Sequence, residues 1–295
     1  MFWLWIFPAG SAAGPAEDCF CRLTPPQIEQ RLSEIHRSHP DFIGRVEAIS
    51  AAFLDTPYGF SPLGEGPGRE PDPDPLIRFD RVDCQTLVEQ VLALSMSPEL
   101  ERALQVLNRI RYFGGLVEYT KRKHFVAAQW LADNQRLGLL MDITERIGGR
   151  FTVWRTKKLD VLAWRRRRPQ GVWPLLSERE IPLVEVRLPV VPPLRAVENL
   201  HLLPSGSIML VVREDRADKP VLVSHMGLVI DKKGKLFFRH ASKKAGRVVD
   251  EELQVYLTRL VSFRSWPVAG VNFQLAREFQ PVAGGLNKAA GHDNR

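Results

Sequence analysis

The spacing of apolar residues changes near the middle of the chain. Before residue 150 they recur every three or four positions, as in 98–113, where Leu100, Leu104, Leu107 and Ile110 fall on one helical face. After residue 150 they gather in short runs rich in Val, Leu and Phe, which are typical of β-strands. Helices first and strands later predict an α+β fold rather than alternating βαβ units.

The expected elements follow from these patterns and from the residues that interrupt them. The predicted helices cover 25–38, 41–54, 84–94, 98–113 and 122–138, and the predicted strands cover 150–156, 181–191, 206–214, 220–231, 235–242 and 259–266. Residues 57–78 carry Gly, Pro and Asp at a density that indicates a long loop. No internal repeat occurs. We predict one domain over 22–282, after a separate segment at 1–18 and before a disordered tail at 283–295.

Composition narrows the class of protein. The chain is 44% hydrophobic and 25% charged, as in folded soluble proteins, and no apolar run reaches the roughly 18 residues that cross a bilayer, so we expect no stable membrane insertion. The net charge of +7 suits nucleic acid, anionic lipid or an anionic cell-wall polymer, although a merely solvated basic surface is the more common reason for such an excess. The four arginines at 165–168 lack interleaved aromatic residues, so we predict a solvated loop and no nucleic-acid partner.

The N-terminus and the cysteines bear on the cellular compartment. An apolar block at 2–7 is followed by small residues at 9–16, which resembles the end of an export signal without its positively charged start. We therefore predict export to the periplasm or the cell wall. Cys19 and Cys21 lie close together, and three cysteines do not suggest a disulfide framework. Cys84 has no partner close in sequence.

Cys84 begins an amphipathic helix and can be interpreted in two ways. Asp83 is a suitable N-cap, and the apolar residues that follow share the face of Cys84, so a buried structural cysteine is one interpretation. The other is a nucleophile. Unpaired N–H groups and the helix dipole favour an anion at a helix N-terminus, which predicts a lowered thiol pKa there. A nucleophilic cysteine also needs a histidine partner.

Two of the seven histidines fall on one predicted hairpin. A turn centred between Lys232 and Lys233 places His225 directly opposite His240 on one face. A three-residue loop closed by Gly234 places the two rings on opposite faces instead. Both registers remain open at this stage. Gly227 follows His225 by two residues, and its lack of a side chain leaves room for a ring or another chain.

These segments together resemble a known family. "TPYGFSPLGEG", "RFDRVDCQTLVE", "SHMGLVI" and "FFRHAS" are similar, in this order, to motifs of the NlpC-type papain-fold cysteine peptidases that act on bacterial peptidoglycan. The segment "IRYFGGLVEYTKRKHFVAAQWLADNQRLG" is similar to one branch, the N-acetylmuramoyl-L-alanine amidase-like domains. The resemblance covers roughly 50–265. It implies a papain-like α+β fold in which the nucleophile begins a helix that packs on an antiparallel sheet.

The resemblance also implies roles for individual residues. Cys84 matches the nucleophile, His225 the general base, His240 the residue that orients the base, and Tyr58 the loop tyrosine over the site. Gln85 and Thr86 replace the serine and glycine usual after the nucleophile in the wider family. The residues expected to contact substrate in addition to Tyr58 are Asp83, Arg122 and His124.

The implied reaction is hydrolysis, through a thioester, of the amide between N-acetylmuramic acid and L-alanine, with no cofactor. The expected partner is peptidoglycan or a muropeptide, bound by a monomer. Three alternatives remain. They are cleavage between D-glutamate and the diamino acid, a zinc hydrolase that uses Cys84, His225 and His240 as ligands, and a peptidoglycan-binding module without activity.

Overall fold

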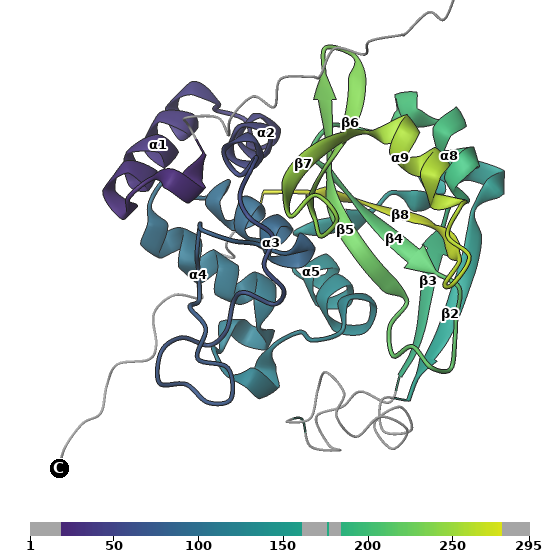
Figure 1. Ribbon diagram of the computed structural model, residues 1–295, viewed down its shortest axis with the longest axis horizontal. Coiled ribbons are helices and arrows are strands. Elements are labelled where there is room, and N and C mark those ends of the chain that lie inside the picture. Colours follow the sequence, from purple (N-terminus) through teal and green to yellow (C-terminus); the bar gives the residue numbers. More distant parts are fainter. Residues whose placement is uncertain (1–18, 161–175, 177–183, 279–295) are drawn as a thin grey trace, which may run out of the picture.

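The computed structural model describes residues 19–160, 176 and 184–278. The predictions for 1–18, for the arginine cluster at 165–168 and for 283–295 concern residues outside this part of the chain. Within it, helices precede strands, as predicted for an α+β fold (Figure 1). The larger helices of the first half are α1 (Pro25–Ser38), α2 (Phe42–Ala52), α3 (Cys84–Leu94), α4 (Leu100–Arg111) and α5 (Leu131–Arg136).

A six-stranded sheet forms the second half of the fold. Its strand order is β1-β8-β4-β5-β6-β7, and all neighbouring strands pair antiparallel. The strands are β1 (Leu140–Asp142), β4 (Ser207–Arg213), β5 (Val223–Lys232), β6 (Lys235–Ser242), β7 (Arg247–Glu252) and β8 (Val268–Ala276). A separate two-stranded sheet pairs β2 (Val153–Leu159) with β3 (Val184–Val190).

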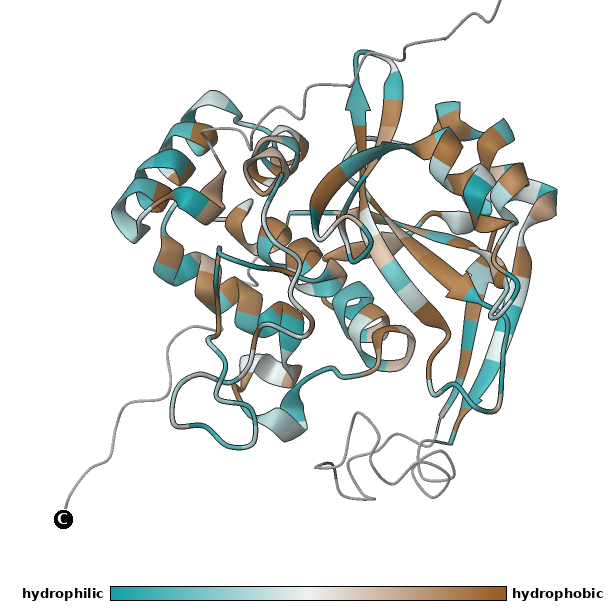
Figure 2. Cartoon of the chain, viewed as in Figure 1, coloured by the Kyte–Doolittle hydropathy of each residue, from teal (hydrophilic) through white to brown (hydrophobic). Residues whose placement is uncertain are grey.

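Helices cover both faces of the larger sheet (Figure 1). The helices of the first half lie on one face, and α8 (Pro193–Glu198) and α9 (Leu253–Leu260) lie on the other. Along β4, Ile208 and Leu210 belong to the core under the first helices, while Met209 and Val211 belong to the core under α9. This alternation is the period-two pattern of a strand buried on both faces. In Figure 2 the apolar residues follow these two interfaces.

Helix α3 lies at the centre of the first core. From Leu87 to Leu94 all its side chains are buried, including those of Glu89 and Gln90. It packs against α4 on one side and against β5 and β6 on the other. The start of α3 is therefore held against the strands that carry the two histidines.

Two predicted elements differ from the structure. Within 122–138, only Val126–Trp130, a π-helical turn, and α5 are helical, and His124 precedes both. The predicted strand at 259–266 is the end of α9 followed by a loop, because Leu253, Tyr256, Leu257 and Leu260 form a helical stripe that packs on the sheet. The prediction missed strands β1, β7 and β8.

The structure adds a pairing that the sequence left open. Cys19 and Cys21 are bonded to each other in a disulfide beside Thr56, which leaves Cys84 as the free thiol. None of the described helices has both the length and the apolar character that crossing a bilayer requires.

Candidate active site

The start of α3 is fixed by a reciprocal cap. Oδ1 of Asp83 accepts a hydrogen bond from the N–H of Thr86 at 2.8 Å, and Oγ1 of Thr86 accepts one from the N–H of Asp83 at 2.9 Å. Oδ2 of Asp83 accepts a further bond from the N–H of Ser61, in the long loop, at 3.1 Å. Both carboxylate oxygens are thus used within the protein, and the substrate contact expected of Asp83 stays a prediction. The cap fixes where Cys84 begins the helix.

The thiol of Cys84 is held as a neutral group. Burial raises its pKa to about 12, and the nearby Asp83 carboxylate adds to the rise. The backbone N–H groups of Met226, Gln85 and Cys84 itself favour the thiolate but do not outweigh burial. The expected lowering of this pKa is therefore wrong for the resting protein, because desolvation opposes the helix N-terminus and is the stronger effect. The N–H groups remain directed at the sulfur.

The hairpin of the two histidines closes in a two-residue turn. Lys232 pairs with Lys235, and Lys233 and Gly234 between them have φ values of 57° and 84°, as in a type I′ turn. The turn is centred one residue later than the predicted symmetric turn, and it is not the three-residue loop. Moving the centre by one residue moves the pairing by two. The two rings therefore share a face but are offset along the strands instead of directly opposite.

The offset brings the two imidazoles into contact. Nε2 of His225 lies 2.8 Å from Nδ1 of His240, and the ring planes meet at 86°. The ladder between β5 and β6 ends at the pair of Leu228 with Arg239, so the strands separate where His225 lies. The N–H of Met226, beyond this ladder, reaches the Cys84 sulfur from the sheet side.

Gly227 makes the space that the histidine pair needs. A Cβ atom at this position would lie 2.6 Å from the carbonyl oxygen of Arg239 and 2.8 Å from Cβ of His240. No side chain fits there without moving the backbone of β6. This agrees with the room for a ring that the sequence predicted at Gly227.

The pair continues into two residues that sequence analysis missed. Nε2 of His240 lies 2.9 Å from Oε1 of Glu251, and Oε2 of Glu251 lies 2.5 Å from Nη1 of Arg259. Glu251 is at the end of β7, and Arg259 is in the last turn of α9. The helical spacing of apolar residues in 253–260 is the signal that could have placed Arg259. Nothing in the sequence marks Glu251 over its neighbours.

Burial also keeps the histidines neutral. It lowers the pKa of His225 to about 3, with His240 and Arg213 adding to the fall and Glu251 opposing it. It lowers the pKa of His240 as well, against the opposing bond to Glu251. Arg213, at the end of β4, donates to Oγ of Ser224 at 2.8 Å. A neutral thiol and two neutral imidazoles therefore form the resting site.

Tyr58 and Tyr256 interact electrostatically with Cys84. Burial raises the pKa of both phenols, and the negative charge of a Cys84 thiolate raises each further, although for Tyr256 the Glu251 carboxylate raises it more. The N–H of Tyr58 donates to the carbonyl of Gly246, so the long loop is attached to the sheet at this point. The Tyr256 ring lies 5.4 Å from that of His240. The structure thus brings Cys84, Tyr58 and both histidines into one region.

Arg122 is engaged within the protein. Its guanidinium donates to Oε1 of Glu65 at 2.7 and 2.5 Å and to Oδ2 of Asp72 at 2.9 Å. Both acidic residues belong to the long loop, so Arg122 fastens that loop to the helical half. The expected contact between Arg122 and substrate stays a prediction.

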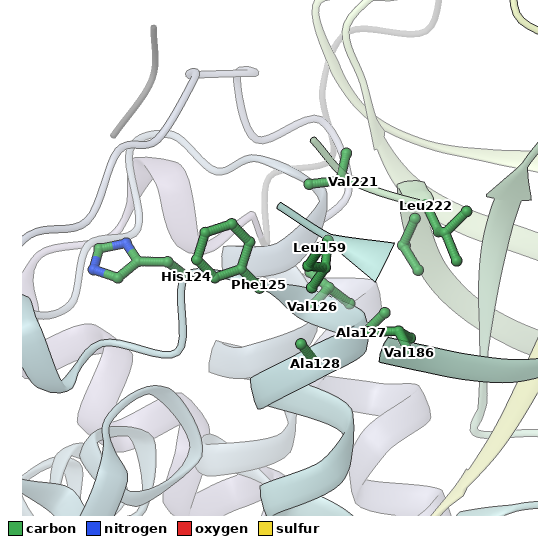
Figure 3. Close-up of a pocket in the computed structure, with 10 residues that line it drawn as sticks. His124, Phe125, Val126, Ala127, Ala128, Leu159, Val186, Val221 and Leu222 are labelled. Atoms are coloured by element: carbon green, nitrogen blue, oxygen red, sulfur yellow. The ribbon is translucent and has the colours of Figure 1, made fainter. Parts of the chain in front are cut away.

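His124 is likewise engaged. Its Nε2 lies 2.7 Å from the carbonyl oxygen of Tyr119, and burial lowers its pKa to about 4. His124 borders a small apolar cavity of about 40 Å³ that also includes Leu222 and Val223, just before His225. In Figure 3 its imidazole extends away from Val221 and Leu222. Its expected role in substrate binding also stays a prediction.

Fold and site together define a class: an α+β protein in which a helix-start thiol lies against the strand that carries one of two hydrogen-bonded histidines. The chain belongs to the AmiA-like family, described as N-acetylmuramoyl-L-alanine amidase-like, whose model matches residues 48–262. No curated protein matches the chain.

Two solved structures share the fold. A protein of Legionella pneumophila str. Philadelphia 1, from a family of domains of unknown function, is 26% identical with a TM-score of 0.75, over 87% of this chain and 96% of its own. An N-acetylmuramoyl-L-alanine amidase of Bacteroides uniformis ATCC 8492 is 24% identical with a TM-score of 0.63, over 80% of this chain and 99% of its own. The second comparison bears on the fold alone.

Proposed function

We propose that this protein is a papain-like cysteine amidase that cleaves the bond between N-acetylmuramic acid and L-alanine in peptidoglycan or its fragments. The observation that carries the proposal is the contact of 2.8 Å between His225 and His240, on a strand whose next N–H, that of Met226, reaches the helix-start thiol of Cys84. Membership of the N-acetylmuramoyl-L-alanine amidase-like family supports the choice of bond. The net charge of +7 suits the carboxylates of the substrate.

The neutral resting state determines the order of proton transfers. Nε2 of His225 is bonded to His240, which leaves Nδ1 of His225 for the thiol. As the Cys84 sulfur attacks the lactyl carbonyl of the muramic acid, its proton passes to Nδ1 of His225. The backbone N–H of Cys84 stabilises the oxyanion of the tetrahedral intermediate. His225 then protonates the leaving amine of L-alanine, and water hydrolyses the thioester with His225 as general base.

The zinc alternative is disfavoured by the geometry of the rings. Nε2 of His225 and Nδ1 of His240 point at each other across a hydrogen bond, whereas two metal ligands direct their lone pairs at a common ion. Among the residues that the structure describes, no three His, Cys, Asp or Glu side chains gather where they could hold a metal ion.

The proposal includes export of the protein, because export would bring it to the peptidoglycan. The apolar and small residues at 2–16 resemble an export signal. The disulfide between Cys19 and Cys21 suits an oxidising compartment such as the periplasm. A fusion of the N-terminal segment to a reporter that is active only outside the cytoplasm tests this point. A fusion that stays inactive contradicts export.

Digestion of a defined muropeptide, analysed by mass spectrometry, tests the reaction. We expect N-acetylmuramic acid and a free peptide that begins with L-alanine. Release of a peptide that begins with the diamino acid would instead identify the D-glutamyl endopeptidase. No cleavage, with binding retained, would identify a module without activity.

Controls in the same assay separate thiol from metal chemistry. We expect Cys84→Ala and His225→Ala to abolish cleavage and EDTA to leave it unchanged. Activity that survives Cys84→Ala, or that is lost to EDTA, contradicts the cysteine mechanism.

A further inference from the structure

The histidine pair is asymmetric, because only His240 has a carboxylate partner. Nε2 of His240 lies 2.9 Å from Oε1 of Glu251. Burial by itself raises the pKa of Glu251, but hydrogen bonds from Arg259 and His240 lower it overall, so the group is ionised at neutral pH. An ionised carboxylate only accepts hydrogen bonds. The proton of this bond therefore belongs to Nε2 of His240.

This assignment propagates to His225. A neutral imidazole carries one N–H, so His240, with its proton on Nε2, has an acceptor at Nδ1. The bond of 2.8 Å between Nδ1 of His240 and Nε2 of His225 then takes its proton from His225. His225 is left with an unprotonated Nδ1, and this is the atom that must accept the thiol proton. The opposite tautomer of His225 carries its proton on Nδ1, so this nitrogen cannot accept the thiol proton.

The surrounding residues hold the rings in the geometry that this requires. The Phe238 ring stacks on His240, with centroids 4.8 Å apart and planes at 18°, and it meets His225 edge-on at 5.8 Å. Arg259 anchors the second oxygen of Glu251 at 2.5 Å. The carboxylate therefore sits at a fixed place relative to both rings.

We propose that Glu251, anchored by Arg259, is a positioning residue that acts through His240 to fix His225 in the tautomer with a basic Nδ1. The inference extends the proposed amidase mechanism and rests on it for its catalytic meaning. A purely structural role is the competing explanation, because the Glu251–Arg259 pair also joins β7 to α9. The test must therefore read the tautomer itself as well as the rate.

The tautomer can be read by NMR without any turnover. Protein labelled with ¹⁵N-histidine in a Cys84→Ala background gives separate signals for protonated and unprotonated ring nitrogens. We expect His225 to be protonated at Nε2 only. In Glu251→Gln the amide can turn its NH₂ group toward His240, so we expect a mixture or a reversal of the tautomers of both rings.

Glu252→Gln is the matched control. Glu252 is the next residue on β7, and its carboxylate pairs with Lys235 at 2.8 Å, away from the rings. We expect this variant to keep the wild-type tautomers. A His225 tautomer that is unchanged in Glu251→Gln overturns the inference, even if the melting temperature falls, because a fall in stability alone is what a structural role predicts.

Kinetics with Cys84 intact complete the test. We expect Glu251→Gln to lower kcat by about 10- to 100-fold with little change in KM, and Glu252→Gln to change neither. Glu251→Asp, which keeps the charge, should recover part of kcat. An unchanged kcat in Glu251→Gln overturns the inference. If wild-type protein cleaves no muropeptide, the proposed function fails, and the NMR result still decides whether Glu251 sets the tautomer.

Discussion

Two partly buried polar networks border this fold, and they lead to different groups. In the loop network, Arg122 donates to Glu65 and Asp72, and the network holds the long loop in place. In the histidine network, His240 bonds Glu251 on one side and His225 on the other, and the chain of bonds ends at a ring nitrogen of His225. Burial and charge are common to both networks. What differs is the group that each network positions: loop carboxylates in one, and an imidazole on the strand beside Cys84 in the other.

The same contrast separates two half-buried histidines. Burial lowers the pKa of His124 to about 4 and that of His225 to about 3, so titration alone does not distinguish them. Nε2 of His124 is hydrogen-bonded to the carbonyl of Tyr119, and its ring packs against the Tyr119 ring. Nε2 of His225 is instead hydrogen-bonded to a second imidazole, that of His240. The protonation of one ring in such a pair sets the tautomer of the other. A perturbed pKa thus marks a candidate, and the hydrogen-bond partner decides its role.

The largest expected effect concerns these two histidines. We expect His225→Ala to lower kcat/KM on a muropeptide by about 10³-fold, because the variant loses the base and the group that protonates the leaving amine. We expect His124→Phe, which keeps a ring against Tyr119, to leave kcat nearly unchanged and to raise only KM, as the predicted substrate contact of His124 requires. Steady-state kinetics on the two purified variants measures both. Equal losses in the two variants would show that the contrast between the networks is mistaken.

Removal of Arg122 should have the next largest effect, on stability. Arg122→Met leaves Glu65, whose side chain is 1% exposed, without its cation, and we expect the free energy of unfolding to fall by about 3 kcal/mol. Urea unfolding followed by circular dichroism measures this loss.

Two further variants sharpen the test of the loop network. Arg69→Met, in the same loop and exposed, should change stability by no more than about 0.5 kcal/mol. Glu65→Gln combined with Arg122→Met should recover part of the loss, because the buried charge is then gone. If Arg122→Met costs no more than Arg69→Met, the network does not fasten the loop.

The sequence predicted Cys84 and the histidine hairpin better than it predicted Glu251 and Arg259. The capped helix start at Cys84 and the hairpin of His225 and His240 are local features, and both occur in the structure. Neither predicted register of the hairpin occurs, because Lys233 and Gly234 both adopt positive φ values and form a turn centred one residue later. Local patterns therefore give the elements but not the offset between the rings.

Glu251 and the state of the thiol depend on tertiary structure. Glu251 reaches His240 only because β7 pairs with β6 in one register and α9 supplies Arg259. The pattern at 259–266 was interpreted as a strand, which removed Arg259 from consideration. Likewise, a helix N-terminus is visible in the sequence, but the burial that raises the pKa of Cys84 to about 12 is not.

A smaller effect is expected in the pH dependence of stability. The folded protein keeps His124 neutral down to about pH 4, whereas the unfolded chain protonates it below about pH 6.5. The unfolded state thus binds more protons in this window, and the free energy of unfolding falls as the pH falls through it. We expect His124→Phe to reduce this slope by up to about 1.4 kcal/mol per pH unit. Urea unfolding at several pH values between 4 and 7 measures it, and an unchanged slope would contradict a neutral His124.

The smallest effect is expected for the influence of His225 on the alkylation rate of Cys84, for which a resting ion pair would predict a large effect. With Cys84 held as a neutral thiol, its alkylation by iodoacetamide should rise about tenfold per pH unit from pH 6 to 9 without a plateau, because only the thiolate reacts. His225→Ala should change the alkylation rate at pH 7 by less than about threefold, since a neutral His225 does not stabilise a thiolate at rest. The rate can be followed by mass spectrometry of the modified protein. A plateau that begins below pH 7 and disappears in His225→Ala would mean that the two groups rest as an ion pair, and that the histidine network holds a proton before substrate arrives.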